Sequence, residues 1–138
     1  MTGFSIQTVN NIIIRFQYYP DAAPFTCAAF SKSLPFSKTF FHARVSGQEI
    51  WIDDAPLLDV IQENSSVFSL PGEIVIGPVK PSRNKVAGLM GIFYGEGKLI
   101  DGGNIFGKVF DEDLPLLKEL GEQIWKQGAQ ELKFENYK

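Results

Sequence analysis

One stretch in the first half of the chain decides the interpretation of the fold, Phe40-Phe41-His42-Ala43-Arg44-Val45-Ser46-Gly47-Gln48-Glu49-Ile50-Trp51-Ile52-Asp53. Two runs of alternating side chains are joined here by Gly47-Gln48. Glycine in the first central position is typical of a two-residue type II′ turn. The pattern therefore predicts a β-hairpin over residues 40–53, in which Arg44 lies opposite Trp51 and Ala43 opposite Ile52.

This register gives the hairpin two faces, because side chains alternate across a strand. The face expected in the core carries Phe41, Ala43, Val45, Ile50 and Ile52. The other face carries His42, Arg44, Ser46, Glu49, Trp51 and Asp53. Such a face is either a solvated surface with cross-strand ion pairs or a binding site. A tryptophan among charged groups favours the binding site.

Composition narrows the class of protein. The 138 residues fit one domain, residues 1–138, and 44% hydrophobic content with 12 phenylalanines indicates a core rich in aromatic side chains. A net charge of −3 offers no general attraction to phosphate backbones, so we expect no nucleic-acid partner. The single cysteine cannot form an internal disulfide, and no apolar run is long enough to span a membrane. We therefore expect a cytoplasmic protein without a membrane partner.

The N-terminal third is expected to form a hairpin and a helix. Residues 4–18 hold two apolar runs separated by Asn10-Asn11, which suits a tight turn. A helix is predicted from Pro20 to about Leu34, with Asp21 as its cap. Cys27 lies on the apolar stripe of that helix and is interpreted as a core residue, with a catalytic thiol as the alternative.

The remainder alternates strands and loops before a second helix. We expect an irregular segment over 54–72 that is functional or folds over a sheet edge, and a basic connector over 80–85 that is solvated or forms a lid. The other predicted elements are strands 73–76, 86–94, 104–109 and 130–135, a mobile glycine-rich connector 95–103, and a helix from about 111 to Gly128. Two helices among hairpin-linked strands favour a mainly β fold, a closed antiparallel β-barrel capped by helices.

Several motifs, in order, resemble cyclophilins. They are Ala23-Pro24-Phe25-Thr26-Cys27-Ala28-Ala29-Phe30, Phe41-His42 followed by Gly47, Gly91-Ile92-Phe93-Tyr94, and Asp101-Gly102-Gly103-Asn104-Ile105-Phe106-Gly107-Lys108-Val109. The resemblance spans roughly residues 12–135 and implies the cyclophilin-like barrel. The chain resembles still more closely a short bacterial cyclophilin-like family of unknown function. That resemblance rests on His42-Ala43-Arg44, Ser46-Gly47-Gln48-Glu49, Trp51 and Gln62-Glu63-Asn64.

The departures from cyclophilins bear on activity. The position of the isomerase arginine falls on Ala43, and Arg44 lies one residue further on, which in a regular strand is the opposite face. The two glutamines of the isomerase site correspond to Trp51 and Ile92. Its tryptophan corresponds to Leu99, and its histidine to Asn104 or to a one-residue deletion. Prolyl isomerase chemistry is therefore not carried over directly.

Three functions remain open from the sequence. The first is a site that binds a small carboxylate- or amide-containing molecule. An enzymatic version of this function would also convert that molecule. Arg44 would grip the ligand, Trp51 would stack, and His42 would act as acid or base, oriented by Asp53 or Glu49. The hypothesised residues are His42, Arg44 and Glu49 for catalysis, and Trp51, Phe93, Tyr94 and Asn104 for ligand binding.

The second function is binding of a short peptide or prolyl isomerisation, with Phe93 and Tyr94 as an apolar shelf. The third is a homo-oligomeric scaffold that uses the exposed hairpin as its interface, since tryptophan and arginine are common interface anchors. We expect no metal and no cofactor, because one histidine with scattered carboxylates lacks the ligand spacing of a zinc site.

Overall fold

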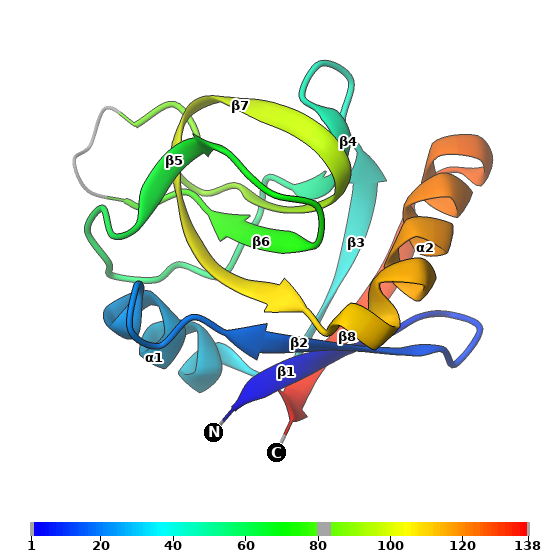
Figure 1. The fold of residues 1–138 in the computed structure, drawn as a ribbon, viewed down its shortest axis with the longest axis horizontal. Helices are drawn as coiled ribbons and strands as arrows, with labels where there is room; N and C mark the ends of the chain where they lie inside the picture. Colours follow the sequence, from blue (N-terminus) through cyan, green and yellow to red (C-terminus); the bar gives the residue numbers. More distant parts are fainter. Residues whose placement is uncertain (1, 80–83, 138) are drawn as a thin grey trace.

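A computed structural model describes residues 2–79 and 84–137 of the chain. Its elements are β1 (Gly3–Gln7), β2 (Ile13–Tyr18), α1 (Pro24–Ser33), β3 (Phe36–His42), β4 (Gly47–Ile52), β5 (Ser65–Phe68), β6 (Glu73–Ile76), β7 (Met90–Val109), a 3-10 turn (Asp111–Asp113), α2 (Leu114–Gln127) and β8 (Gln130–Tyr137). Within these residues, six strands close an antiparallel barrel in the order β2-β1-β8-β3-β4-β7, and pairing of β2 with β7 completes the ring (Figure 1). The predicted barrel is confirmed.

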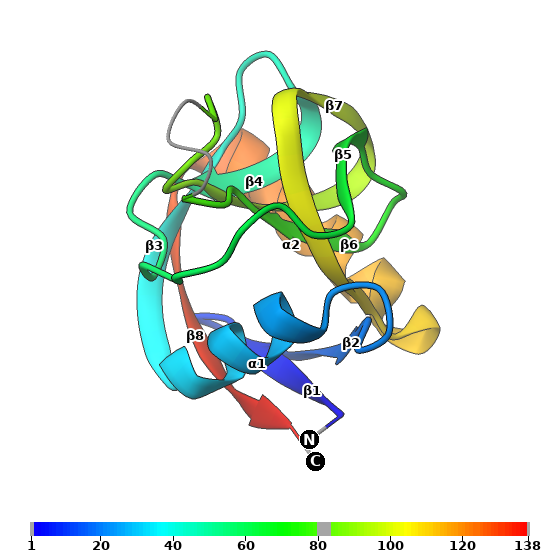
Figure 2. The ribbon, with the colours of Figure 1, turned by 90° about the vertical axis from the view of Figure 1, so that its left-hand side faces the viewer.

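Phenylalanine side chains fill the barrel. Phe4 stacks on Phe16 with ring centroids 4.8 Å apart, and Phe36 stacks on Phe134 at 4.7 Å. Phe30 of α1 packs into the same cluster as the barrel residues, and so do Leu117, Leu120 and Ile124 of α2. Both helices therefore cover the interior of the barrel, as Figure 2 shows for α1 on the near side and α2 on the far side.

The hairpin of residues 40–53 forms, but its predicted register is wrong. Trp51 pairs with Phe41 rather than with Arg44, and Ile50 pairs with His42, a shift of three residues. An odd shift exchanges the two faces of one strand relative to the other. Ile50, Ile52 and Ala43 are buried as expected, whereas Phe41 is half exposed and Val45, which lies outside the strand, is 89% exposed. Residues 43–46 form a loop instead of continuing the strand.

The reason for the shift lies in a strand distant in sequence. Gly47 pairs with Gly97 of β7 rather than starting a two-residue turn, and it has a φ of +100°. A Cβ at Gly47 would lie 2.5 Å from the carbonyl oxygen of Glu96, so only glycine fits this close approach. The pairing of β4 with β7 thus fixes the register of β4, whereas the local turn preference does not.

β7 is one continuous strand of 20 residues, which replaces two predicted strands and their connector. The glycine-rich segment 95–103 was predicted to be a mobile connector. It is instead paired strand, with Gly97 against β4 and Lys98 and Gly103 against β5. The strand curls so strongly that β6 pairs with both of its halves: Ile74 contacts both Ile92 and Gly107 (Figures 1 and 2).

The first helix begins at Pro24, later than predicted, and Asp21 does not cap it. Its N-terminal N–H groups are satisfied from the irregular segment: the Glu63 carboxylate accepts hydrogen bonds from the backbone of Phe25 at 3.1 Å and of Thr26 at 2.8 Å. A carboxylate at a helix N-terminus is favoured by the helix dipole. Cys27 is buried and its thiol donates to the Phe106 carbonyl, which supports its interpretation as a core residue.

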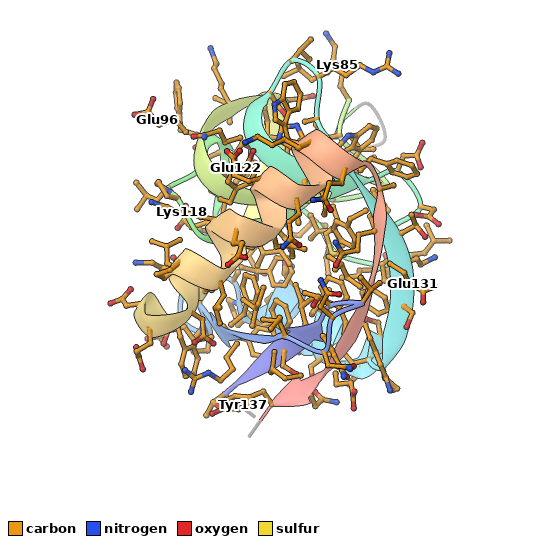
Figure 3. All side chains as sticks on the ribbon, turned by 90° about the vertical axis from the view of Figure 1, so that its right-hand side faces the viewer. Lys85, Glu96, Lys118, Glu122, Glu131 and Tyr137 are labelled. Atoms are coloured by element: carbon orange, nitrogen blue, oxygen red, sulfur yellow. The ribbon has the colours of Figure 1, made fainter. Side chains whose placement is uncertain are left out.

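The C-terminal elements follow the prediction. Gly128 ends α2 with a φ of +104°, and Leu132 and Phe134 of β8 point into the core. Lys118 and Glu122 lie on the solvent side of α2 (Figure 3). No helix among the described residues is long and apolar enough to cross a membrane. The predicted basic connector lies largely outside the described residues, which resume at Asn84.

Candidate functional site

A cavity of about 730 Å³ opens where β3 ends and the 43–46 loop begins. Its polar side chains are those of His42, Arg44, Ser46 and Glu49. Most of its remaining lining is apolar: Phe41, Val45, Trp51, Val75, Val86, Leu89, Met90, Leu99, Ile100 and Ile124. A largely apolar cavity with a few convergent polar groups is the usual form of a small-molecule site.

Glu49 is the most unusual group in this cavity. It projects from β4 and is only 5% exposed, and its Oε1 accepts a hydrogen bond from the Ser46 hydroxyl. Burial raises the pKa of Glu49 to about 7, because removing a carboxylate from water disfavours its charged form, while the Ser46 hydrogen bond acts in the opposite direction. The carboxyl therefore exchanges its proton near neutral pH.

The neighbouring strand makes room for this carboxyl. Gly91 of β7 lies beside Glu49, and a Cβ at position 91 would be 1.7 Å from Oε2 of Glu49. Any larger residue at position 91 would displace the carboxyl from its place in the wall of the cavity. Glycine inside a strand often marks such a close approach.

Arg44 lies in the loop that borders the cavity, where it is exposed. No ion pair or hydrogen bond engages its guanidinium among the described residues. Trp51 is half-buried, lines the cavity and has Phe41 as its cross-strand neighbour. Because Arg44 is outside regular strand, strand alternation does not fix the side of the barrel wall on which it lies.

His42 lines the cavity, but both of its ring nitrogens are engaged. Nδ1 lies 2.8 Å from the Ala43 carbonyl oxygen, and Nε2 lies 2.6 Å from the Tyr94 hydroxyl. A carbonyl oxygen only accepts, so Nδ1 is the donor and, in the neutral ring, Nε2 accepts from Tyr94. The ring also packs on Trp125 of α2 at 4.7 Å. Neither Asp53 nor Glu49 orients the imidazole, contrary to the expected pairing.

Three predicted ligand-binding residues lie away from the cavity lining. Phe93 is fully buried in a small cluster with Val75 and Ile105, whereas Tyr94 points into the main core. They are on opposite faces of β7 and do not form a common shelf. Asn104 is buried too: its Oδ1 accepts from the Glu63 backbone, and its Nδ2 donates to Thr26 and to the Ile61 carbonyl. Asn104 thereby fastens the irregular segment to the barrel.

Sequence reasoning missed the part of the cavity that β6, β7 and residues 86–89 supply. Leu99 and Ile100 belong to the segment interpreted as a connector, and Val75 and Leu89 were assigned only to strands. The apolar pair Leu99-Ile100 between polar neighbours was the available signal. It indicates paired strand rather than free loop.

The closed antiparallel barrel with its two covering helices is a cyclophilin-like fold. The chain belongs to the family described as protein of unknown function (DUF3830), whose model matches residues 7–136. No curated protein sequence matches the chain.

Solved structures agree on the fold. McbB in complex with tryptophan matches with a TM-score of 0.77 and 19% identity over 96% of this chain and 44% of McbB, so the chain spans less than half of that protein. The hypothetical protein AF2241 from Archaeoglobus fulgidus matches with a TM-score of 0.66 and 17% identity, covering 99% of this chain and 95% of AF2241.

A cyclophilin-type peptidyl-prolyl cis-trans isomerase from Cryptosporidium parvum, solved in the presence of the dipeptide Ala-Pro, also matches. It gives a TM-score of 0.63 and 18% identity over 99% of both chains. At these identities the likeness concerns the fold alone.

Proposed function

We propose that this protein binds a small molecule that carries a carboxylate or planar amide group on an apolar body, inside the cavity at the β3–β4 end. The observation that carries the proposal is Arg44, an exposed cation without a partner among the described residues, at the border of an apolar cavity. A guanidinium binds a carboxylate through two parallel hydrogen bonds, and an unpaired one is available for a ligand.

The remaining groups have complementary roles in this proposal. Trp51 offers an aromatic wall on which a planar ligand stacks. Burial raises the pKa of Glu49 to about 7, which suits proton transfer to or from a bound molecule. The proposal therefore extends from binding of the ligand to its chemical conversion. His42 has a positioning role instead, because its Nδ1–H holds the Ala43 carbonyl next to Arg44. McbB, of which 44% is matched by this chain, was solved in complex with tryptophan, a molecule that carries a carboxylate on an aromatic body.

Arg44→Ala is expected to weaken binding of carboxylates about 10- to 100-fold, since hydrogen bonds to charged groups are worth roughly 1.5–3 kcal/mol. The measurement is a thermal-shift screen of small aromatic and aliphatic carboxylates and cyclic amides, followed by calorimetry on those that raise Tm. Lys118→Ala is the matched control, because it removes the same charge from the solvent side of α2 (Figure 3). If no compound of these classes raises Tm, or Arg44→Ala leaves their affinity unchanged, the proposal fails.

Prolyl isomerisation is the alternative that the fold raises, and we expect no rate above background. The resemblance to cyclophilins implies an arginine at position 43 and an apolar shelf for the proline ring. Position 43 is a buried alanine, and Phe93 is fully buried beneath Val75, Ile105 and Leu99. A proline-peptide isomerisation assay with an active cyclophilin alongside is the measurement. A rate that rises with protein concentration would revive this function.

A further inference from the structure

We propose that the ligand is an amino-carboxylate with an apolar side chain, whose ammonium group is received by the free oxygen of Glu49 while its carboxylate is held by Arg44. The inference rests on the proposed function for the carboxylate end and adds a second, separate subsite for the amine. Aromatic and branched-chain α-amino acids are the simplest members of this class.

Glu49 has unused hydrogen-bonding capacity. Its Oε1 accepts from Ser46, whereas its Oε2 accepts no hydrogen bond among the described residues. Glu49 is nevertheless only 5% exposed and lines the cavity, with its Oε2 against Gly91. A buried carboxylate without a partner is costly, and a donor that carries positive charge offsets that cost best.

The charge distribution around Glu49 supports the same assignment. In the part of the chain that the structure describes, the titratable and charged side chains lining the cavity are His42 at the end of β3, Arg44 in the 43–46 loop, and Glu49 itself. The lining from β6, β7, α2 and residues 86–89 is apolar or glycine. Because no ion pair joins Arg44 to Glu49 among the described residues, the cavity above about pH 7 holds an anion and a cation that do not neutralise each other. A zwitterion complements both.

The remaining lining of the cavity is largely apolar. Leu99 and Met90 belong to this lining and offer apolar contacts, and Trp51 adds an indole ring. A hydrocarbon or aromatic side chain gains roughly 25 cal/mol for each Å² of apolar surface that it buries there. An amino-carboxylate with a polar side chain would lose this contribution. We therefore assign the apolar side chain as a requirement.

Three matched probes separate the two subsites: L-phenylalanine, 3-phenylpropanoate without the amine, and phenethylamine without the carboxylate. We expect L-phenylalanine to bind at least tenfold more tightly than either fragment, measured by calorimetry near pH 8. Glu49→Gln should weaken phenethylamine and L-phenylalanine at least tenfold and leave 3-phenylpropanoate unchanged or tighter. Arg44→Ala should weaken binding of 3-phenylpropanoate and leave the affinity for phenethylamine unchanged.

The wild-type protein provides a test that needs no variant. Because the ammonium binds the ionised carboxylate, and burial raises the pKa of Glu49 to about 7, phenethylamine should bind about tenfold more weakly near pH 6 than near pH 8. 3-Phenylpropanoate should not weaken over this range. Calorimetry in buffers of different ionisation enthalpy should show proton release when phenethylamine binds near pH 6.

The outcomes distinguish this inference from the proposed function. If 3-phenylpropanoate binds and depends on Arg44, but phenethylamine does not bind or binds equally well to Glu49→Gln, the amine subsite is overturned and the carboxylate site stands. If phenethylamine binds with the predicted pH dependence and 3-phenylpropanoate does not bind, the carboxylate site is overturned instead.

Discussion

Glu49→Gln is expected to stabilise the protein near pH 8 by about 3 kcal/mol and to change its stability near pH 4 very little. Burial raises the pKa of Glu49 from 4.5 to about 7 in the folded protein. The folded state therefore binds the proton more tightly than the unfolded state does. Stability contributed by the protonated carboxyl is fully present below pH 4.5 and is lost as pH rises through about 7. Glutamine keeps the shape of the protonated group and carries no charge to bury.

Urea denaturation of both proteins from about pH 4 to pH 8 measures this effect as the difference between two stability curves. The difference should grow with pH and level off above the folded-state pKa of Glu49. Glu96→Gln is the matched control, because Glu96 is an exposed acid on the adjacent strand β7 (Figure 3). A difference curve for Glu49→Gln that is as flat as that of Glu96→Gln would mean that the carboxyl is not desolvated.

Phe134→Ala is expected to lower the free energy of unfolding by about 3–5 kcal/mol, the range for removing a buried aromatic ring. Phe134 is fully buried, and its ring lies 4.7 Å from that of Phe36, 5.5 Å from Phe40 and 5.8 Å from Phe4. These neighbours come from β1 and β3, the two strands that pair with β8, so they are held by the sheet and cannot collapse into the space. The cavity left by the ring therefore adds to the free-energy cost of the lost apolar burial.

The measurement is again urea denaturation, together with a fall in Tm of roughly 10–20 °C by calorimetry. Phe68→Ala serves as the control, since Phe68 on β5 is 64% exposed and its removal should cost little. Phe134→Leu should recover most of the loss because it refills the space with apolar volume. A Phe134→Ala variant as stable as Phe68→Ala would contradict the assignment of this ring to the centre of the core.

The sequence predicted those parts of the fold that depend on local patterns. The strand predicted over 130–135 forms within β8, and the helix predicted from about 111 to Gly128 forms as a 3-10 turn followed by α2. The turn at Asn10-Asn11 also formed where asparagine permits it, with Asn11 at a φ of +64°. In each case the local preference and the tertiary environment agree, so the pattern alone is sufficient.

Predictions failed where a contact distant in sequence overrides the local preference. Gly47 followed by Gln48 has the composition of a tight turn, yet Gly47 pairs with Gly97. The glycines between 95 and 103 suggested a loop, but Gly97 and Gly103 lie in paired strand, where a Cβ would be 2.3 Å from the Ser46 carbonyl oxygen and 2.5 Å from Cγ2 of Val75. Asp21 was a reasonable helix cap, and Glu63 from a segment nearly forty residues away performs that role.

Only part of the residue set predicted for the site lines the cavity, since Phe93, Tyr94 and Asn104 do not. His42, Arg44, Glu49 and Trp51 do line one cavity, although the register used to group them was wrong. The residues next to Glu49 in the sequence do not indicate its burial. The carboxyl occupies space that is open only because position 91, on another strand, is a glycine. Cross-strand complementarity of this kind is visible only once the register is known.

The two tryptophans of the chain occupy positions that make each an intrinsic fluorescence reporter of a different event. Trp51 lines the cavity, so its emission in a Trp125→Phe background follows filling of the cavity. Trp125 packs on His42, so its emission in a Trp51→Phe background reports how α2 packs against the end of β3. The phenyl rings of the three probes absorb at shorter wavelengths than indole does. Occupancy of the cavity and movement of the helix above His42 can thus be followed separately, without attaching a dye.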